Sequence, residues 1–220
     1  MTDKFFPQEL YPFQDQVLRI IHPLKTGFYL TGGTAVSRGY LQHRYSDDLD
    51  FFVNDEEQFG LWGERIIQAL NARAEWKLDV GLRQPRFIRL SLLKDNINLK
   101  LEFVNDVPAH VGEIKEHPLL GRLDSPENIL ANKLTAIIDR DEPKDLADIW
   151  GLCTKLRLSL EDAIRGAQGK AAGIFAADLA RVLLSASPAD WAVIRWIQRP
   201  EVDIFTKELH LLGEKLLLIE

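Results

Sequence analysis

The first half of the chain alternates strand-like and helix-like runs of apolar residues. β-Branched and large apolar residues, with polar residues between them, predict strands at residues 27–32 and 48–53, and two or three further strands in residues 75–82, 86–93 and 97–104. Between the second and third of these runs, residues 56–74 carry the spacing of an amphipathic helix, and another helix is expected from about Thr34. This order predicts an α+β or α/β fold with a mixed β-sheet core.

Near Gly121 the apolar spacing becomes helical. Ser125 and Pro126 suit a helix cap and its first turn, and residues 127–140 carry apolar positions three and four apart. Pro143 begins a second predicted helix. We therefore expect a helical C-terminal part after the sheet.

This change in pattern also predicts the domain organisation. We expect an α/β core over residues 1–120 and a helical subdomain, packed on that core, over residues 121–220. Residues 191–198 and 205–220 are predicted to form amphipathic helices of this subdomain. No long, flexible linker separates the two parts in the sequence.

Composition limits the classes of function. The chain has 220 residues, of which 46% are hydrophobic and 27% charged, which is typical of a globular protein. Its 27 basic and 33 acidic residues give a net charge of −6, which argues against non-specific nucleic-acid binding over the whole surface. A single cysteine, Cys153, excludes an internal disulfide, and no signal-peptide or membrane-span pattern occurs. We expect a cytoplasmic protein that does not enter membranes.

The second predicted strand carries two carboxylates among apolar residues. Strand side chains alternate, so Leu49 and Phe51 face one side while Asp48 and Asp50 face the other, with Cα atoms about 7 Å apart. Two like charges held so close, and partly out of water, need a cation. Mg²⁺ prefers such oxygens, and two ions about 4 Å apart suit phosphoryl transfer.

A glycine turn precedes this strand. Gly32 and Gly33 let the backbone approach a ligand and turn its N–H groups toward an anion, and Thr34 adds a hydroxyl. Each feature alone is common. Together they follow the order strand, glycine turn, helix and carboxylate strand. This order predicts that a nucleoside triphosphate binds at the turn, with metal ions on the two carboxylates.

Two runs of the sequence resemble a known family. Residues 30–53, LTGGTAVSRGYLQHRYSDDLDFFV, and residues 132–152, NKLTAIIDRDEPKDLADIWGL, are similar to the AbiEii/AbiGii toxin nucleotidyltransferases, a branch of the DNA polymerase β-like superfamily. The resemblance implies a nucleotidyltransferase fold, Mg²⁺-dependent transfer from an NTP, and pairing with an antitoxin in phage defence or growth control. Several relatives modify the acceptor end of tRNA.

The resemblance also implies roles for single residues. It places Gly32, Gly33 and Thr34 at the nucleotide and makes Asp48 and Asp50 the metal ligands. In the superfamily a neighbouring strand commonly supplies a third carboxylate, for which Glu102 is the best candidate. The alternative for Glu102 is an ion pair with Lys100 on an exposed face.

The second run supplies cations. Lys133 and Arg140 lie seven residues apart on one predicted helix face, where they can bind triphosphate oxygens or simply lie at the helix edge. The resemblance favours phosphate binding and places Lys144 and Asp145 at the site. Asp145 can act as a base or orient Lys133. Asp148 is expected to pair with Lys144 or to support helix packing.

Other polar residues give weaker signals. His43 and Arg44 precede the carboxylate strand and are further candidates, whereas the five histidines lack the spacing of zinc ligands. The most basic part of this acidic chain is formed by Arg83, Arg86, Arg89, Lys94 and Lys100. These side chains can steer a nucleic-acid acceptor or belong to a solvated sheet face.

Three hypotheses follow. The first is a nucleotidyltransferase with catalytic residues Asp48, Asp50, Lys133 and Asp145, an NTP as substrate and an RNA such as tRNA, or a protein, as acceptor. The second is a phosphatase that forms an aspartyl-phosphate, which the glycine helix before the strand and the bulky Phe52 disfavour. The third is a non-catalytic module that binds a nucleotide or a partner.

Overall fold

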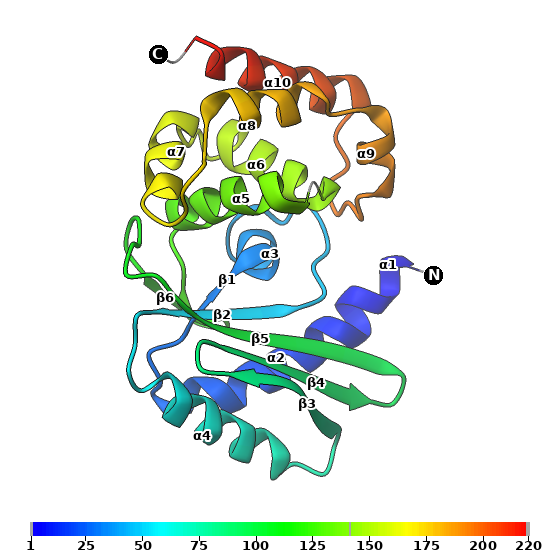
Figure 1. Ribbon diagram of the computed structural model, residues 1–220. Helices are drawn as coiled ribbons and strands as arrows, with labels where there is room; N and C mark the ends of the chain where they lie inside the picture. The colour runs from blue at the N-terminus through cyan, green and yellow to red at the C-terminus, as the bar shows by residue number, and fades with distance from the viewer. Residues whose placement is uncertain (1, 141, 219–220) are drawn as a thin grey trace. The chain divides into compact units, whose positions relative to one another are not determined.

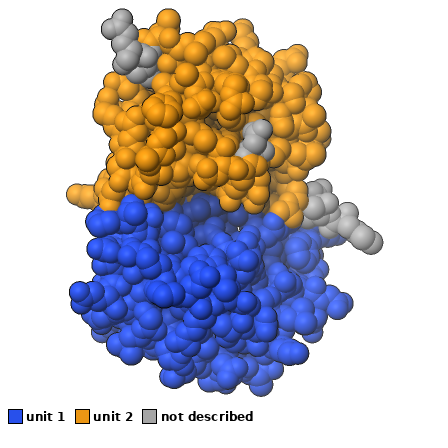
Figure 2. All heavy atoms as spheres, viewed as in Figure 1, with its two compact units in different colours: residues 1–35, 46–108, 114–124 blue, residues 36–45, 109–113, 125–220 orange. Residues whose placement is uncertain are grey.

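A computed structural model describes residues 2–140 and 142–218 of the chain. The chain forms two compact units, which Figure 2 colours separately. Unit 1 comprises residues 1–35, 46–108 and 114–124, and unit 2 comprises residues 36–45, 109–113 and 125–220. Unit 2 therefore includes two short segments, residues 36–45 and 109–113, that come from the first 120 residues of the sequence.

Unit 1 is built on a seven-stranded mixed sheet (Figure 1). Its strands are β1 Tyr29–Thr31, β2 Leu49–Asn54, β3 Lys77–Gln84, β4 Phe87–Lys94, β5 Ile97–Asp106, β6 Lys115–His117 and β7 Gly121–Leu123. In space they follow the order β3-β4-β5-β2-β1-β7-β6. β2 pairs with β5, and β1 with β7, in parallel, and the other neighbours are antiparallel. The two predicted strands at residues 27–32 and 48–53 correspond to β1 and β2, and the three runs in which two or three strands were expected form β3, β4 and β5.

Two helices of unit 1, α2 Tyr11–Ile21 and α4 Phe59–Asn71, lie along one side of this sheet (Figure 1). The other helices of this unit are α1 Thr2–Phe5, η1 Phe6–Leu10, η2 His22–Leu24 and α3 Gly32–Thr34. Phe28, just before β1, contacts Phe59 of α4 and Phe103 of β5 edge to face, with ring centroids 5.7 and 5.1 Å away. Ile66 of α4 is fully buried. Burial of these apolar side chains is the main stabilisation of the unit.

The alternation on β2 determines what the opposite face carries. Leu49, Phe51 and Val53 are buried, whereas Asp50 and Phe52 are only partly buried. This agrees with the predicted alternation, because every second side chain of a strand points to the same face. The buried residues pack toward the helices, and the carboxylate projects from the other side.

Unit 2 is helical. It contains most of η3 Ala35–Leu41, then α5 Pro126–Arg140, α6 Pro143–Thr154, α7 Leu160–Gln168, α8 Ala176–Leu184, α9 Pro188–Val193 and α10 Val202–Leu216. The Ser125 hydroxyl accepts a hydrogen bond from the backbone N–H of Asn128 at 3.0 Å, which is the predicted cap of α5. The starts of α5 and α6 at prolines are also confirmed.

An aromatic cluster lies in the core of unit 2. The rings of Trp150, Trp196 and Phe205 meet edge to face, with centroids 5.4 to 5.9 Å apart. Cys153 is buried on α6, and burial raises the pKa of its thiol to about 12. The thiol therefore stays protonated and acts as a small apolar side chain.

Residues 191–198 do not form the single helix that their spacing predicts. α9 ends at Val193, and the next residues run alongside the segment that ends at Tyr45, whose backbone N–H donates to the Arg195 carbonyl at 2.7 Å. Trp196 packs into the aromatic cluster. The prediction was wrong because backbone partners distant in sequence, which local spacing does not reveal, hold this segment extended.

Two further differences concern the ends of the sheet and of the chain. β6 and β7 were not predicted, since each has three residues and no run of apolar side chains. The final predicted helix corresponds to α10 and ends at Leu216, while residues 219–220 lie outside the described part. Among the described residues, no helix combines the length and the apolar character needed to span a membrane.

Candidate functional site

The glycine turn of unit 1 brings the backbone against a carboxylate. Gly32 begins α3, earlier than the predicted start at Thr34, and adopts a left-handed conformation with φ of +68°. A Cβ at this position would overlap the Oδ2 atom of Asp50. Any other residue would therefore displace the carboxylate and strain the backbone. The turn and the carboxylate strand form one local structure.

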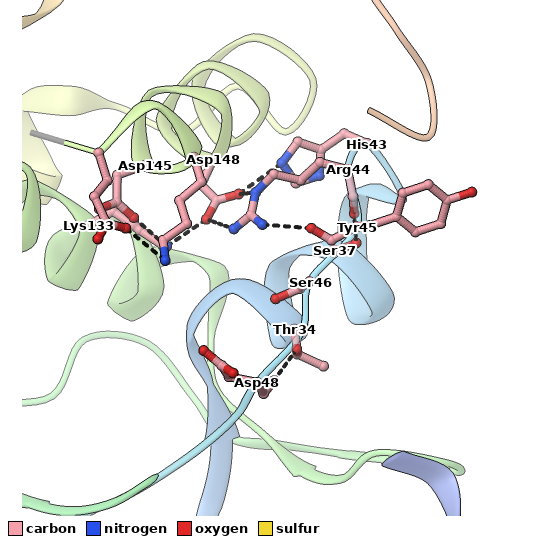
Figure 3. A network of polar contacts seen from close by, with 12 residues as sticks. Thr34, Ser37, His43, Arg44, Tyr45, Ser46, Asp48, Lys133, Asp145 and Asp148 are labelled. Carbon is pink, nitrogen blue, oxygen red and sulfur yellow. Dashed lines mark hydrogen bonds and ion pairs between the residues drawn. The ribbon is translucent and has the colours of Figure 1, made fainter. Parts of the chain in front are cut away.

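Thr34 fixes the chain just before β2. Its side chain is fully buried, and its hydroxyl donates to the backbone carbonyl of Asp48 (Figure 3). The hydroxyl thus holds the segment that carries the first carboxylate of the pair. Its predicted contact with the nucleotide stays a prediction.

Four side chains form a row across the sheet. Thr31 of β1 lies opposite Asp50 of β2, Asp50 lies opposite Glu102 of β5, and Glu102 lies opposite Arg89 of β4. Directly opposite residues project from the same face. The Nε of Arg89 donates to Oε1 of Glu102 at 2.8 Å. The structure therefore brings Glu102 beside Asp50 on one face, as the third-carboxylate prediction requires, and also gives it a cationic neighbour.

Lys100 lies among these carboxylates. Its Nζ is 3.0 Å from Oδ2 of Asp48 and 3.4 Å from Oε1 of Glu102. Partial burial acts to lower the pKa of Lys100. The hydrogen bond with Asp48 and the charges of Asp48, Glu102 and Asp50 outweigh burial and raise this pKa, so Lys100 stays charged. The ion pair with Glu102 that the sequence left as an alternative is present.

The donor set of unit 1 fits a hard divalent cation. Asp48 and Asp50 offer carboxylate oxygens from neighbouring positions, and Gly32 leaves room for one of them at the turn. Within residues 2–140 and 142–218, no three His, Cys, Asp or Glu side chains are grouped as metal ligands. Mg²⁺ commonly takes one or two protein carboxylates and completes its coordination with water and substrate phosphate, which this pair allows.

The basic stretch of unit 1 is largely neutralised by acidic neighbours. The pairs and their N–O distances are Arg83 with Glu64 at 2.8 Å, Arg86 with Asp55 at 3.1 Å, Arg89 with Glu102 at 2.8 Å and Lys100 with Asp48 at 3.0 Å. Lys94 reaches the amide oxygen of Gln16. Since each of these arginines faces a carboxylate, the stretch does not form a uniformly basic surface.

In unit 2 the predicted cations meet on Asp145. The Nζ of Lys133 donates to Oδ1 of Asp145 at 2.7 Å, and Arg140 donates from Nε to Oδ2 at 2.8 Å and from Nη2 to Oδ1 at 3.0 Å. Asp145 and Lys133 are buried, whereas 45% of the Arg140 side chain is exposed. The two cations share a helix face, as their spacing predicts.

Asp148, one turn further along α6, holds a second set of cations (Figure 3). Arg44 donates from Nε and Nη2 to its two oxygens at 2.7 Å each, His43 Nε2 lies 2.9 Å from Oδ1, and Lys133 Nζ lies 2.6 Å from Oδ2. The expected pairing of Asp148 with Lys144 is wrong. Lys144 points to solvent and pairs with the nearby Glu142 carboxylate, because burial of Asp148 excludes it.

Burial and ion pairing set the protonation of this network. Burial would raise the pKa of Asp148, but the charges of Arg44 and Lys133 and the hydrogen bonds from His43 and Arg44 hold it well below 3.8. Burial likewise opposes the shift at Asp145, whose pKa is lowered by Lys133 and Arg140. Burial lowers the pKa of His43 despite Asp148, which favours a neutral ring.

Sequence reasoning underestimated Asp148 and its partners. The spacing of Asp145 and Asp148, three residues apart on α6, places both carboxylates on one helix face and was a usable signal. His43 and Arg44 were singled out only by their position before the carboxylate strand. Their contact with a residue more than a hundred positions away became visible in the structure alone.

Comparison with known proteins agrees with the fold and with the two motif runs. The family model described as "Nucleotidyl transferase AbiEii toxin, Type IV TA system" matches residues 16–195. An uncharacterized protein of Aquifex aeolicus (strain VF5) is 34% identical over 129 residues. That match spans 58% of this chain and 58% of the Aquifex protein, so the chain spans little more than half the length of that curated relative.

Solved structures share the fold. MenT4, a nucleotidyltransferase toxin from Mycobacterium tuberculosis H37Rv, superposes with a TM-score of 0.64 at 14% identity, over 96% of this chain and 84% of MenT4. JHP933 from Helicobacter pylori gives a TM-score of 0.63 at 18% identity, over 98% of this chain and 93% of that protein. The fold is thus a nucleotidyltransferase fold, which confirms the predicted fold class.

The mixed sheet, the glycine turn and the carboxylate pair define the class of nucleotidyltransferase-fold proteins. Within that class, the match over most of its length shows that the chain belongs to the AbiEii nucleotidyl transferase toxin family. The resemblance read from the two motif runs is therefore confirmed.

Proposed function

We propose that the chain is an Mg²⁺-dependent nucleotidyltransferase that moves a nucleoside monophosphate from an NTP to an acceptor and releases pyrophosphate. The observation that carries this proposal is the placement of the Asp50 carboxylate directly against the Gly32 turn, with Asp48 beside it, in a member of this family. A cation-binding pair and an anion-binding turn in one local structure suit a metal-bound triphosphate.

In this proposal unit 1 supplies the metal ligands and the phosphate turn. Asp48 and Asp50 hold Mg²⁺, and the backbone at Gly32 and Gly33 binds phosphate oxygens. When bound, Mg²⁺ neutralises charge on the phosphates and positions them for in-line displacement. Thr34 supports this arrangement because its hydroxyl donates a hydrogen bond to the backbone carbonyl of Asp48.

The family resemblance supports Lys133 and Arg140 as phosphate-binding residues. Two of the three N–H donors of the Lys133 ammonium contact Asp145 and Asp148. Much of the Arg140 side chain is exposed, and its guanidinium suits phosphate oxygens. Asp145 orients Lys133 and Arg140. Its lowered pKa makes it a weak base, which disfavours the base role considered from the sequence.

The acceptor in this proposal is an RNA such as tRNA, or a protein, and the chain acts as the toxin of a pair with an antitoxin. The family description, which names a Type IV toxin-antitoxin system, supports the pairing. A role in phage defence, and a location in the cytoplasm where NTPs and tRNA are found, belong to the same proposal.

The test is label transfer. Each of four α-labelled NTPs is offered with Mg²⁺ to total RNA and to a cell extract, using the native chain, Asp50→Asn and the control Asp79→Asn, an exposed carboxylate of β3. We expect one labelled pool with the native chain and the control, and at least about a hundredfold less label with Asp50→Asn.

Two outcomes would contradict the proposal. Equal labelling by Asp50→Asn would show that the carboxylate pair is not the metal site of the reaction. Binding of an NTP without label in any pool would instead support the non-catalytic binding module.

A further inference from the structure

Lys100 and Glu102 share the sheet face of the carboxylate pair. They lie two residues apart on β5, and Glu102 is directly opposite Asp50 of β2. Asp48 precedes the same β2 strand, and its Oδ2 is 3.0 Å from the Lys100 Nζ. A cation carried by the chain itself thus lies on the face where a divalent ion is expected.

The position of this cation is specific. The Lys100 Nζ contacts Asp48 on one side and Glu102 on the other, and Glu102 also accepts from Arg89. The Glu102 carboxylate therefore has two cationic neighbours, Lys100 and Arg89. This agrees with the missing three-ligand cluster among the described residues, and we assign the divalent ion to Asp48 and Asp50.

The Lys100 ammonium limits how many ions this face can hold, because it already lies between the Asp48 and Glu102 carboxylates. A second divalent ion between Asp48 and Glu102 would meet the Lys100 ammonium at short range, where like charges repel strongly.

We propose that Lys100 takes the place of one of the two divalent ions of a two-ion phosphoryl-transfer site, so that this chain works with a single ion on Asp48 and Asp50. This inference rests on the proposed function, because it sets the ion count of the same site. Glu102 then acts as a positioning residue, which together with Asp48 holds the Lys100 ammonium in place.

The test counts bound ions. Mn²⁺ is titrated into the chain saturated with an NTP analogue that has a carbon bridge between its α- and β-phosphates, and free Mn²⁺ is measured by electron paramagnetic resonance. We expect one bound Mn²⁺ for the native chain and two for Lys100→Met, which keeps an unbranched side chain, one atom shorter, and removes its charge.

Three further variants sharpen the count. Lys100→Gln is a second neutral variant and is expected to bind two ions. Lys100→Arg keeps the charge and is expected to bind one, as is Lys77→Met, which removes an exposed lysine at the start of β3. Circular dichroism of each variant establishes that it is folded before ions are counted.

Equal ion counts for the native chain and both neutral variants would overturn the inference, and so would two ions, or none, in the native chain. The count does not depend on turnover. Absence of label transfer together with the expected counts would therefore refute the proposed activity and leave the ion assignment standing.

Discussion

The two carboxylate clusters differ in how far solvent reaches them. In unit 1 the side chains of Asp48 and Lys100 are 32% and 38% exposed, whereas in unit 2 those of Asp148 and Lys133 are 0% and 6% exposed. An exposed pair exchanges partners at little cost, but a buried ion that loses its partner stays out of water uncompensated. The first cluster can therefore take up a cation, while the second holds its side chains in fixed positions.

The largest effect is expected from removing Asp148. Asp148→Ala leaves Arg44 and Lys133 buried without their shared carboxylate, and the free energy of unfolding should fall by about 3–5 kcal/mol. Urea denaturation followed by circular dichroism measures this change.

The matched control removes an exposed aspartate. Asp162 of α7 pairs with Arg165, and both side chains are at least 60% exposed. Asp162→Ala should change the free energy of unfolding by less than about 1 kcal/mol. Similar losses in the two variants would mean that burial does not distinguish the clusters.

Acid should gradually remove the contribution of Asp148 to the free energy of unfolding. Its folded-state pKa is held well below 3.8, so its contribution to stability is complete above the unfolded value and is lost as the pH falls through the folded pKa. The difference in unfolding free energy between the native chain and Asp148→Asn should therefore shrink below about pH 4. Denaturation curves at a series of pH values measure it, and an undiminished difference at about pH 2.5 would contradict the assigned shift.

A smaller loss is expected at the turn of unit 1. Gly32→Ala strains a left-handed backbone and displaces the Asp50 carboxylate, so the free energy of unfolding should fall by about 1–2 kcal/mol and label transfer should fall with it. Thermal denaturation and the transfer assay measure the two effects.

Gly60 of α4 offers a control of opposite sign. A Cβ there meets no atom within 4 Å, and its backbone is helical. Gly60→Ala should stabilise the chain by up to about 1 kcal/mol and leave transfer unchanged. Full label transfer in Gly32→Ala would show that the reaction does not need the turn. A loss of label transfer in Gly60→Ala would show that the loss is not specific to the turn.

The smallest effect concerns Thr34. Thr34→Val keeps the shape of a buried side chain and removes the hydroxyl that holds the Asp48 carbonyl, which should lower the free energy of unfolding by about 1 kcal/mol. If Thr34 contacts the nucleotide directly, the KM for the NTP will rise more than this loss of stability explains. Steady-state kinetics with the valine and serine variants distinguishes the two roles.

The sequence by itself determined the elements that depend on local pattern. The alternation over residues 48–53 indicated which side chains of β2 are buried, and Ser125 with Pro126 marked the start of α5. The order of the glycine turn and the carboxylate strand gave Gly32 and Asp50 as candidate site residues, and the structure places them against each other. These features were predictable because strand alternation and helix caps depend on neighbours a few residues apart.

Only the tertiary structure decided which distant residues meet. Arg44 contacts Asp148, which lies 104 positions further along the chain. Lys100 of β5 contacts Asp48, which precedes β2, the strand that pairs with β5. Residues after Val193 became extended through similar contacts. Burial and pairing of charges arise from packing between elements, and packing determined whether each carboxylate is reached by solvent, as Asp48 is, or is buried among fixed partners, as Asp148 is.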